Sequence, residues 1–211
     1  MTIKEMRKAA GMSQQKFSEY FNIPKRTIEA WESGVRVPPD YVPSLIEYKL
    51  EKEGFFDATE NALKKIMEAN ARMLNVGVPR LAISPRKFFK TPTMRAALVG
   101  CENLNDVVLH VNEKYLKELK TDAAQAWLTV SHEMRHLWQL ANGATLDGYA
   151  TSDNVDTKAY NAQDLEVDAW AWATIAVVQN VGVSPDFKNA LGEQLHNAIM
   201  KRASCLLEEI E

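Results

Sequence analysis

Apolar and polar residues alternate along positions 2–50 with the spacing of short amphipathic helices. Ser13 stands where a helix N-cap is expected, and proline and glycine interrupt the pattern between the apolar runs. The pattern therefore predicts a small domain of four short crossing helices, over residues 3–10, 14–21, 25–32 and 41–48. The apolar side chains of the fourth helix that are expected to face the core are Tyr41, Leu45, Ile46 and Tyr48.

The charged stretch 51–57 interrupts this pattern, and we interpret it as the boundary between a domain of residues 1–52 and one of residues 53–211. In the second domain, helical spacing over 58–74 is followed by short apolar runs separated by proline, glycine and asparagine, which are typical of strands. Helical spacing then returns, over residues 113–119, 122–141, 163–179 and 185–211. The predicted fold class is mainly α with a small β-sheet (α+β).

The formal net charge of −3 over 211 residues is unevenly distributed. Residues 1–52 hold nine Lys and Arg against seven Asp and Glu, a net +2, and the remainder holds sixteen against twenty-one, a net −5. This asymmetry fits a DNA-reading domain joined to an acidic one.

The two cysteines, Cys101 and Cys205, form no CxxC pair, so neither a disulfide framework nor a cysteine zinc site is expected. The N-terminal residues lack the apolar core of a signal peptide. No run approaches the roughly 18 apolar residues of a membrane span. We therefore expect a cytoplasmic protein without membrane contact.

The second and third predicted helices, with the short turn between them, have the layout of a helix-turn-helix, in which the second helix of the pair enters the major groove of DNA. On that helix Ile28 and Trp31 can face the core, while polar side chains point outward. A long amide at the start of the preceding helix can also reach a phosphate or a base edge. The candidate DNA contacts are Gln14, Lys25, Arg26, Thr27 and Glu29.

The segment GMSQQKFSEYFNIPKRTIEAWESGVRVPP resembles the lambda-repressor-like, XRE-type helix-turn-helix family. The resemblance implies DNA binding through residues 1–52, with Trp31 and Glu32 in structural roles. Because such proteins commonly dimerise to span two half-sites, a homodimer is expected. The alternative is a protein-interaction module that keeps the fold without affinity for DNA.

His132, Glu133 and His136 form an H-E-x-x-H motif inside the predicted helix 122–141. Histidines four residues apart lie one turn apart on the same face of a helix, so both imidazoles can reach one Zn²⁺. Glu133 beside them is placed to act as general base and not as a ligand. Arg135 is unusual within such a motif, and we expect it to face either solvent or substrate.

A catalytic zinc needs a third protein ligand, and the helix over 163–179 offers three carboxylates. Glu166 shares a face with small alanine side chains that would let this helix approach the H-E-x-x-H helix closely. Asp164 and Asp168 share another face, which suits partners of the ligating histidines or solvated residues. We therefore predict Glu166 as the ligand, with Asp168 as the alternative.

The H-E-x-x-H motif and the segment E-x-D-A-x-A-W-A that begins at Glu166 resemble the gluzincin-like ImmA/IrrE-type metallopeptidases. The resemblance implies a zinc-dependent endopeptidase that cleaves a repressor or another DNA-bound protein. It also implies a strand, residues 106–111, that holds the substrate as an added strand. His110 in this strand is expected to be structural. The sequence departs from the family at Arg135 and at two tryptophans that stand where Asn and Phe are usual.

Two other functions remain open: a transcription regulator whose metal domain is sensory or structural without turnover, and an antitoxin-like interaction protein. The sequence does not single out a residue that stabilises the oxyanion. The candidates are Tyr149, Tyr160 and His196.

Overall fold

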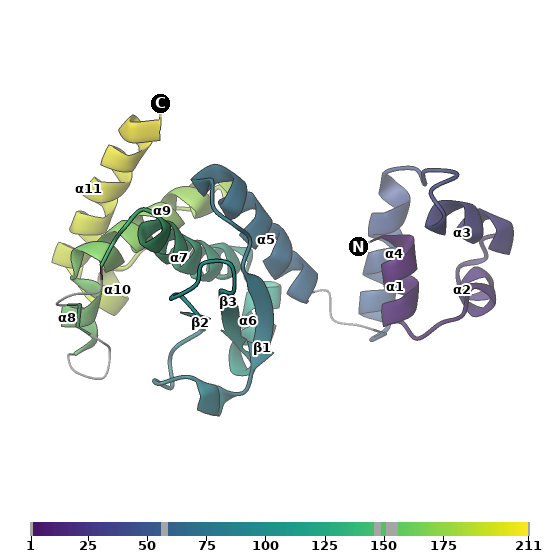
Figure 1. Ribbon diagram of the computed structural model, residues 1–211, viewed down its shortest axis with the longest axis horizontal. Coiled ribbons are helices and arrows are strands. Elements are labelled where there is room, and N and C mark those ends of the chain that lie inside the picture. The colour runs from purple at the N-terminus through teal and green to yellow at the C-terminus, as the bar shows by residue number, and fades with distance from the viewer. Residues whose placement is uncertain (1, 56–58, 146–148, 151–155, 211) are drawn as a thin grey trace. The chain divides into compact units, whose positions relative to one another are not determined.

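The computed structural model describes residues 2–55, 59–145, 149–150 and 156–210. The chain divides into two compact units, Met1–Asn61 and Ala62–Glu211, each with its own hydrophobic core (Figure 1). Most of the described residues are helical and three strands form one sheet, so the predicted α+β class is confirmed. None of the helices in the described part of the chain is long and apolar enough to cross a membrane.

The first unit consists of four short helices that agree with the predicted pattern. They are α1 (Ile3–Ala9), α2 (Gln14–Phe21), α3 (Lys25–Glu32) and α4 (Tyr41–Lys52). Thr2 and Glu5 form a reciprocal capping box at the start of α1, and the Ser13 side chain accepts a hydrogen bond from the backbone of Lys16 at the start of α2. Between α2 and α3, Asn22 adopts a left-handed conformation with φ of 52°, which turns the chain sharply.

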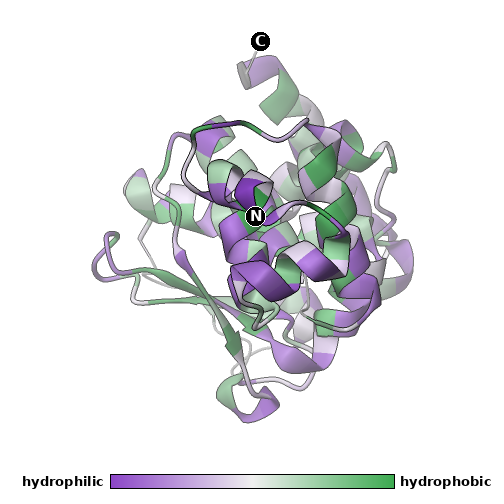
Figure 2. Ribbon diagram, turned by 90° about the vertical axis from the view of Figure 1, so that its right-hand side faces the viewer, coloured by the Kyte–Doolittle hydropathy of each residue, from purple (hydrophilic) through white to green (hydrophobic). Residues whose placement is uncertain are grey.

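The core of this unit differs from the prediction at α4. Tyr41, Leu45 and Tyr48 are 65%, 60% and 62% exposed, whereas Ile46 and Leu50 are buried. Residues 46 and 50 share one face of the helix, and the three exposed side chains lie on another face at spacings of four and three residues. The expected apolar stripe of α4 was therefore wrong, except for Ile46. Figure 2 shows hydrophilic and hydrophobic residues alternating along the helices that face the viewer.

The sheet of the second unit has the strand order β1-β3-β2. Its strands are β1 (Arg80–Ser84), β2 (Ala96–Val99) and β3 (Val108–Asn112). The central strand β3 pairs in parallel with β1 and antiparallel with β2. The predicted substrate-binding edge at residues 106–111 was therefore wrong, because both sides of β3 are paired. On the antiparallel side of β3 lies β2, whose outer edge is unpaired among the described residues and which lies against helix α7.

The helices of the second unit follow the sheet's strands or precede them in the chain. They are α5 (Thr59–Leu74), α6 (Leu116–Thr121), α7 (Ala123–Ala141), α8 (Thr157–Asn161), α9 (Asp164–Val181), α10 (Lys188–Leu191) and α11 (Glu193–Ile210), with 3-10 turns at Arg86–Phe88 and Glu113–Tyr115. The single helix predicted over 185–211 is interrupted at Gly192, whose φ of 89° a helix cannot contain. The main packing is of α7 against α9, and of α9 against α11 (Figure 1).

Two features hold α7 and α9 in register. Ala169 and Ala173 of α9 are fully buried, and their small side chains allow the close approach that the sequence predicts. A buried amide then bridges three helices: the Asn70 Nδ2 of α5 donates to Ser131 Oγ at 2.9 Å, and Trp172 Nε1 donates to Asn70 Oδ1 at 2.9 Å. Because Ser131 precedes the H-E-x-x-H motif directly, this bridge fixes the part of α7 that carries the candidate ligands.

Candidate metal centre

The helical repeat of α7 and the packing of α9 bring His132, His136 and Glu166 together. The two histidine Nε2 atoms are 3.0 Å apart. Glu166 Oε2 lies 3.2 Å from the Nε2 of His132, and Glu166 Oε1 lies 3.4 Å from that of His136. All three ligand atoms lie within 4.8 Å of one another, close enough to hold one metal ion. The predicted set of two imidazoles and one carboxylate is therefore assembled by the fold.

The chemistry of the cluster fits a divalent cation. Glu166 is fully buried, and its Oε2 atom has no hydrogen-bond partner among the described residues, although it faces the imidazoles. An unsatisfied buried carboxylate oxygen is costly unless a cation or donor meets it. Ligands about 2.0–2.1 Å from a tetrahedral Zn²⁺ lie roughly 3.3 Å apart, close to the separations found here. Two histidines and one glutamate also form a known ligand set for zinc.

The charges of the cluster are strongly coupled. Burial raises the pKa of Glu166, but the ring nitrogens and the charge of His132 and His136 beside it outweigh burial and hold that pKa well below its usual range. Burial lowers the pKa of His136, but the hydrogen bond and charge of Glu166 outweigh it and raise the pKa to about 9. A proton on His136 thus balances the buried carboxylate in the metal-free protein, and a cation would take its place.

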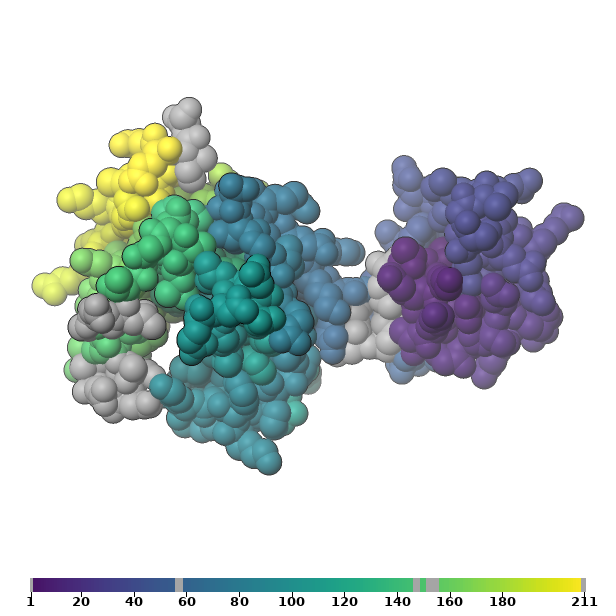
Figure 3. Space-filling model, in the orientation of Figure 1, coloured from purple at the N-terminus to yellow at the C-terminus, as the bar shows by residue number. Residues whose placement is uncertain are grey.

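Glu133 lies in the same cavity as the cluster, as expected of a base that is not a ligand. The cavity has a volume of about 210 Å³, and its wall includes His132, His136 and the strand β2. Figure 3 shows a hollow in the second unit between the teal residues near the sheet and the green helical residues. Burial raises the pKa of Glu133. The two neighbouring histidines and a hydrogen bond from the backbone of Leu98 in β2 offset part of this rise.

Two tyrosines meet the cluster from the other side of the cavity. The Tyr149 hydroxyl donates a hydrogen bond to Glu166 Oε1, and the hydroxyls of Tyr149 and Tyr160 are 3.0 Å apart. Burial and the negative charge of Glu166 raise the pKa of both phenols, so both remain hydrogen-bond donors. His196, the third candidate from the sequence, does not line this cavity and instead accepts a hydrogen bond from the backbone of Phe187.

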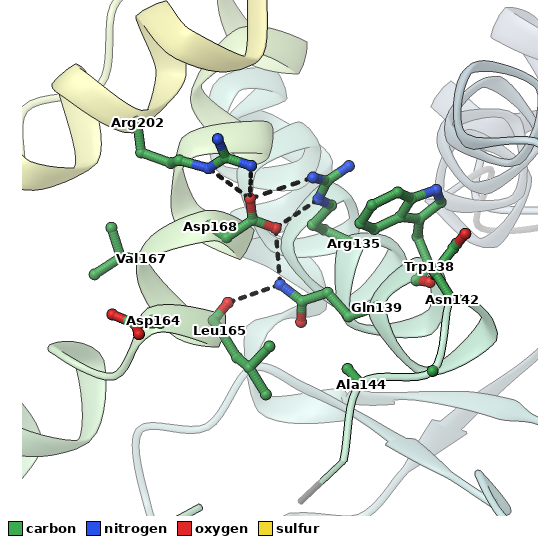
Figure 4. A pocket seen from close by; sticks show the side chains of 11 residues that line it. Arg135, Trp138, Gln139, Asn142, Ala144, Asp164, Leu165, Val167, Asp168 and Arg202 are labelled. Carbon is green, nitrogen blue, oxygen red and sulfur yellow. Dashed lines mark hydrogen bonds and ion pairs between the residues drawn. The ribbon is translucent and has the colours of Figure 1, made fainter. Parts of the chain in front are cut away.

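Asp168, the alternative ligand, belongs to a different group of side chains (Figure 4). It accepts hydrogen bonds from Arg135 at 2.7 Å, Gln139 at 2.9 Å and Arg202 at 2.8 Å. Arg135 is 5% exposed and its guanidinium lies 3.8 Å from the ring centre of Trp138. The expectation that Arg135 faces solvent or substrate was therefore wrong. The third carboxylate of α9, Asp164, is exposed on the surface, as a solvated residue should be.

His110 lies in β3, and its side chain packs within the sheet. The Nδ1 of His110 lies 2.8 Å from Ser84 Oγ, and its ring stacks on Phe88 with centres 4.1 Å apart. These contacts join β3 to β1 and to the turn that follows β1. They give His110 the structural surroundings that the sequence predicts.

The candidate DNA contacts occupy the outer surface of the first unit in all but one case. Lys25, Arg26 and Glu29 are exposed on α3, and Thr27 is partly exposed. Gln14 is instead half-buried, and its Nε2 donates to Glu32 at 2.9 Å. Glu32 in turn binds Arg7 through both carboxylate oxygens, at 2.6 and 3.0 Å. The side-chain nitrogen of Gln14 is therefore engaged within the domain. Its contact with Glu32, together with that of Glu32 with Arg7, joins α1, α2 and α3.

Sequence reasoning missed several partners of the predicted site. Gln139 stands three residues after His136, one helical turn away, and this spacing is a signal that could have found it. Tyr149 and Tyr160 were candidates only for stabilising the oxyanion, and the hydrogen bond of Tyr149 to Glu166 crosses from the segment before α8 to α9. Arg202 comes from α11, and no local pattern connects it to α7.

Residues 3–42 match the family model of the helix-turn-helix. The match contains α1, α2 and α3 and agrees with the short turn between α2 and α3. Because helix-turn-helix domains place a helix in the major groove, the match supports a DNA-binding regulator of transcription. The comparisons of the chain with curated proteins and with solved structures found no match.

Proposed function

We propose that this protein is a DNA-associated, zinc-dependent endopeptidase with a regulatory role, which cleaves a repressor or another DNA-bound protein. One observation carries the proposal: His132, His136 and Glu166 converge within 4.8 Å, and Glu133 lines the same cavity. The helix-turn-helix match supports the association with DNA.

Zn²⁺ held by the three ligands would polarise a water molecule and the carbonyl group of the scissile peptide bond. Glu133 takes the proton from the water and delivers it to the leaving amine. Its raised pKa suits both steps, because a general base works best when its pKa lies near the working pH. Tyr160 lines the same cavity and supplies a hydroxyl for the oxygen on which negative charge develops, whereas the proton of Tyr149 is donated to Glu166.

The free edge of β2 is the proposed binding site for the substrate backbone. Ala96, Ala97 and Leu98 of this strand line the cavity beside Glu133. An extended peptide can pair with the unpaired backbone groups of an edge strand, which aligns one peptide bond with the catalytic groups. The role that the sequence suggested for residues 106–111 is therefore transferred to residues 96–99.

The experiment that tests this proposal compares Glu133→Gln and His136→Ala with the wild type. We expect the first variant to keep its zinc and to lose cleavage of an internally quenched peptide library by at least about 100-fold, because only the base is removed. The second should lose zinc, as measured by elemental analysis. Cleavage that survives Glu133→Gln would contradict the assignment of the base.

A second candidate function is a transcription regulator whose metal domain senses or stabilises without turnover. The hydrogen bond from Tyr149 to Glu166 favours it, because a protein hydroxyl already satisfies one ligand oxygen. This function predicts bound zinc, no cleavage that depends on Glu133, and an affinity for DNA that changes when zinc is removed. A DNA-binding titration of the zinc-loaded and chelator-treated protein separates the two functions.

A further inference from the structure

The charged residue inside the H-E-x-x-H motif belongs to a chain of contacts that ends on a ligand of the metal centre. Arg135 binds Asp168, with Nε 2.7 Å from Oδ2 and Nη2 3.2 Å from Oδ1. Asp168 Oδ2 accepts from Gln139 Nε2 at 2.9 Å, and Gln139 Oε1 lies 2.8 Å from the Nδ1 of His136. Arg135, Asp168 and Gln139 also line a cavity of about 620 Å³ between α7, α9 and α11 (Figure 4).

The orientation of the Gln139 amide follows from its partners. One end of the amide faces two acceptors, the backbone carbonyl oxygen of Leu165 at 2.9 Å and the carboxylate of Asp168 at 2.9 Å. Only the NH₂ group can meet two oxygens, since a reversed amide would place its own oxygen against both. The other end, which faces His136, is therefore the carbonyl oxygen.

This orientation determines which nitrogen of His136 carries a proton. A carbonyl oxygen only accepts, so Nδ1 of His136 must donate. The lone pair of the neutral ring then belongs to Nε2, the atom that lies 3.4 Å from Glu166 and 3.0 Å from the Nε2 of His132. By contrast, Nδ1 of His132 is buried with no hydrogen-bond partner in the described part of the chain. Only one of the two histidines is held in this way.

The two arginines explain why Asp168 orients Gln139 and does not join the cluster. The carboxylate lies between Arg135 and Arg202. The Nε and Nη2 atoms of Arg202 are each 2.8 Å from Asp168 Oδ1. Hydrogen bonds between ionised partners are roughly twice as strong as neutral ones. Both oxygens of Asp168 are therefore engaged away from the metal ligands, and Oδ2 remains an acceptor for Gln139.

We propose that Arg135, Asp168 and Gln139 are positioning residues, which keep the proton of His136 on Nδ1 and thereby aim Nε2 at the metal. The inference rests on the metal centre of the proposed function and not on its peptidase activity. It assigns a purpose to a buried cation within the motif. Loss of a residue that hydrogen-bonds to a metal ligand typically weakens metal binding by about 10- to 100-fold.

The test measures the Zn²⁺ dissociation constant of the full chain by competition with a chelator at fixed pH. Gln139→Met removes all three hydrogen bonds of the amide but keeps the length of the side chain, and we expect about a 10-fold or greater loss of zinc affinity. The matched control is Gln125→Met on the same helix, whose amide donates to Thr129 at 3.0 Å and to no other described residue. This control should bind zinc within about twofold of the wild type. If the wild type itself bound no zinc, the proposed function would fail before this inference was reached.

A second readout separates positioning from general stability. In the zinc-loaded wild type, the Nδ1 proton of His136 should give a slowly exchanging NMR signal, since Gln139 accepts it. The chain has 4 histidines, so the signal can be assigned by single replacements. Gln139→Met should abolish it, and Asp168→Asn, which serves if the first variant does not fold, should shift or broaden it. An unchanged signal and unchanged zinc affinity in either folded variant would overturn the proposal.

Discussion

Glu166 and Asp168 stand two positions apart on α9 and have different environments. At about 100° per residue, their side chains leave the helix in directions about 160° apart. Glu166 enters a space bounded by two imidazoles, whereas Asp168 meets two guanidinium groups. The helical repeat predicted that the two differ, and the choice of Glu166 agrees with the cluster. The ion pair of Asp168 with Arg202 could not be predicted, since Arg202 comes from a distant segment.

We expect zinc binding to strengthen as pH rises from 6 to 8. In the metal-free protein the pKa of His136 is raised from 6.5 to about 9, so a proton occupies this ligand throughout that range and must leave when zinc binds. Displacement of one proton gives an affinity that rises by up to about tenfold per pH unit. Competition with a chelator of known protonation, at several pH values, measures it.

The same shift has the opposite consequence for the stability of the metal-free protein. Because the pKa of His136 is raised above its value in the unfolded chain, the contribution of His136 to stability is fully present below pH 6.5 and is lost as pH rises through about 9.

Zinc affinity that is independent of pH between 6 and 8 would contradict the assignment of His136 as a protonated ligand.

At the scale of elements, the site depends on how α5, α7 and α9 are held against one another. The apolar pattern predicts each of these helices, and the alanines of α9 predict its close approach to α7. The apolar pattern does not predict the strand order β1-β3-β2. An edge strand and a central strand of a small sheet have similar short apolar runs. The edge of the sheet was therefore assigned to residues 106–111, most of which belong to the central strand β3.

The bridge at Asn70 should be a large contributor to the stability of this arrangement. Asn70→Ala would leave Trp172 Nε1 and Ser131 Oγ without this partner inside the core. An unsatisfied buried polar group costs about 1–3 kcal/mol, so we expect the free energy of unfolding to fall by about 2–4 kcal/mol. Urea unfolding of the full chain measures this. The matched control is Asn180→Ala, whose exposed side chain donates only to Ala176 of its own helix and whose change should stay within about 0.5 kcal/mol.

At the scale of the whole molecule, the chain combines a helix-turn-helix with a separate unit that carries the cluster of His132, His136 and Glu166. Each unit has its own buried core, so substitutions at the surface of one should leave the chemistry of the other intact. The net charge of +2 on residues 1–52 is modest for DNA binding. Individual cations on α3 should therefore have a measurable share in the affinity.

Arg26→Ala is expected to weaken binding to a short DNA duplex of arbitrary sequence by severalfold. Arg26 is exposed on α3, and the loss of one phosphate contact should reduce the slope of log affinity against log salt by about 0.9. Fluorescence anisotropy at several salt concentrations measures both quantities. Lys188→Ala, an exposed cation of the second unit, is the control and should leave affinity and slope unchanged. Zinc content should be the same in both variants, and equal effects of the two would argue against DNA binding by α3.

The amino-acid sequence by itself determined the features that depend on neighbours within a few turns of chain. These are the four helices of the first unit with the cap at Ser13, the pairing of His132 with His136 on one helical face, and the direction in which Glu166 leaves α9. Only the tertiary structure decided which side chains from distant segments complete them: Arg202 beside Asp168, Tyr149 on Glu166, and β2 at the edge of the sheet. The physical reason is that the helical repeat relates residues three or four positions apart. Contacts between elements depend instead on how complete helices and strands pack, which the local pattern does not encode.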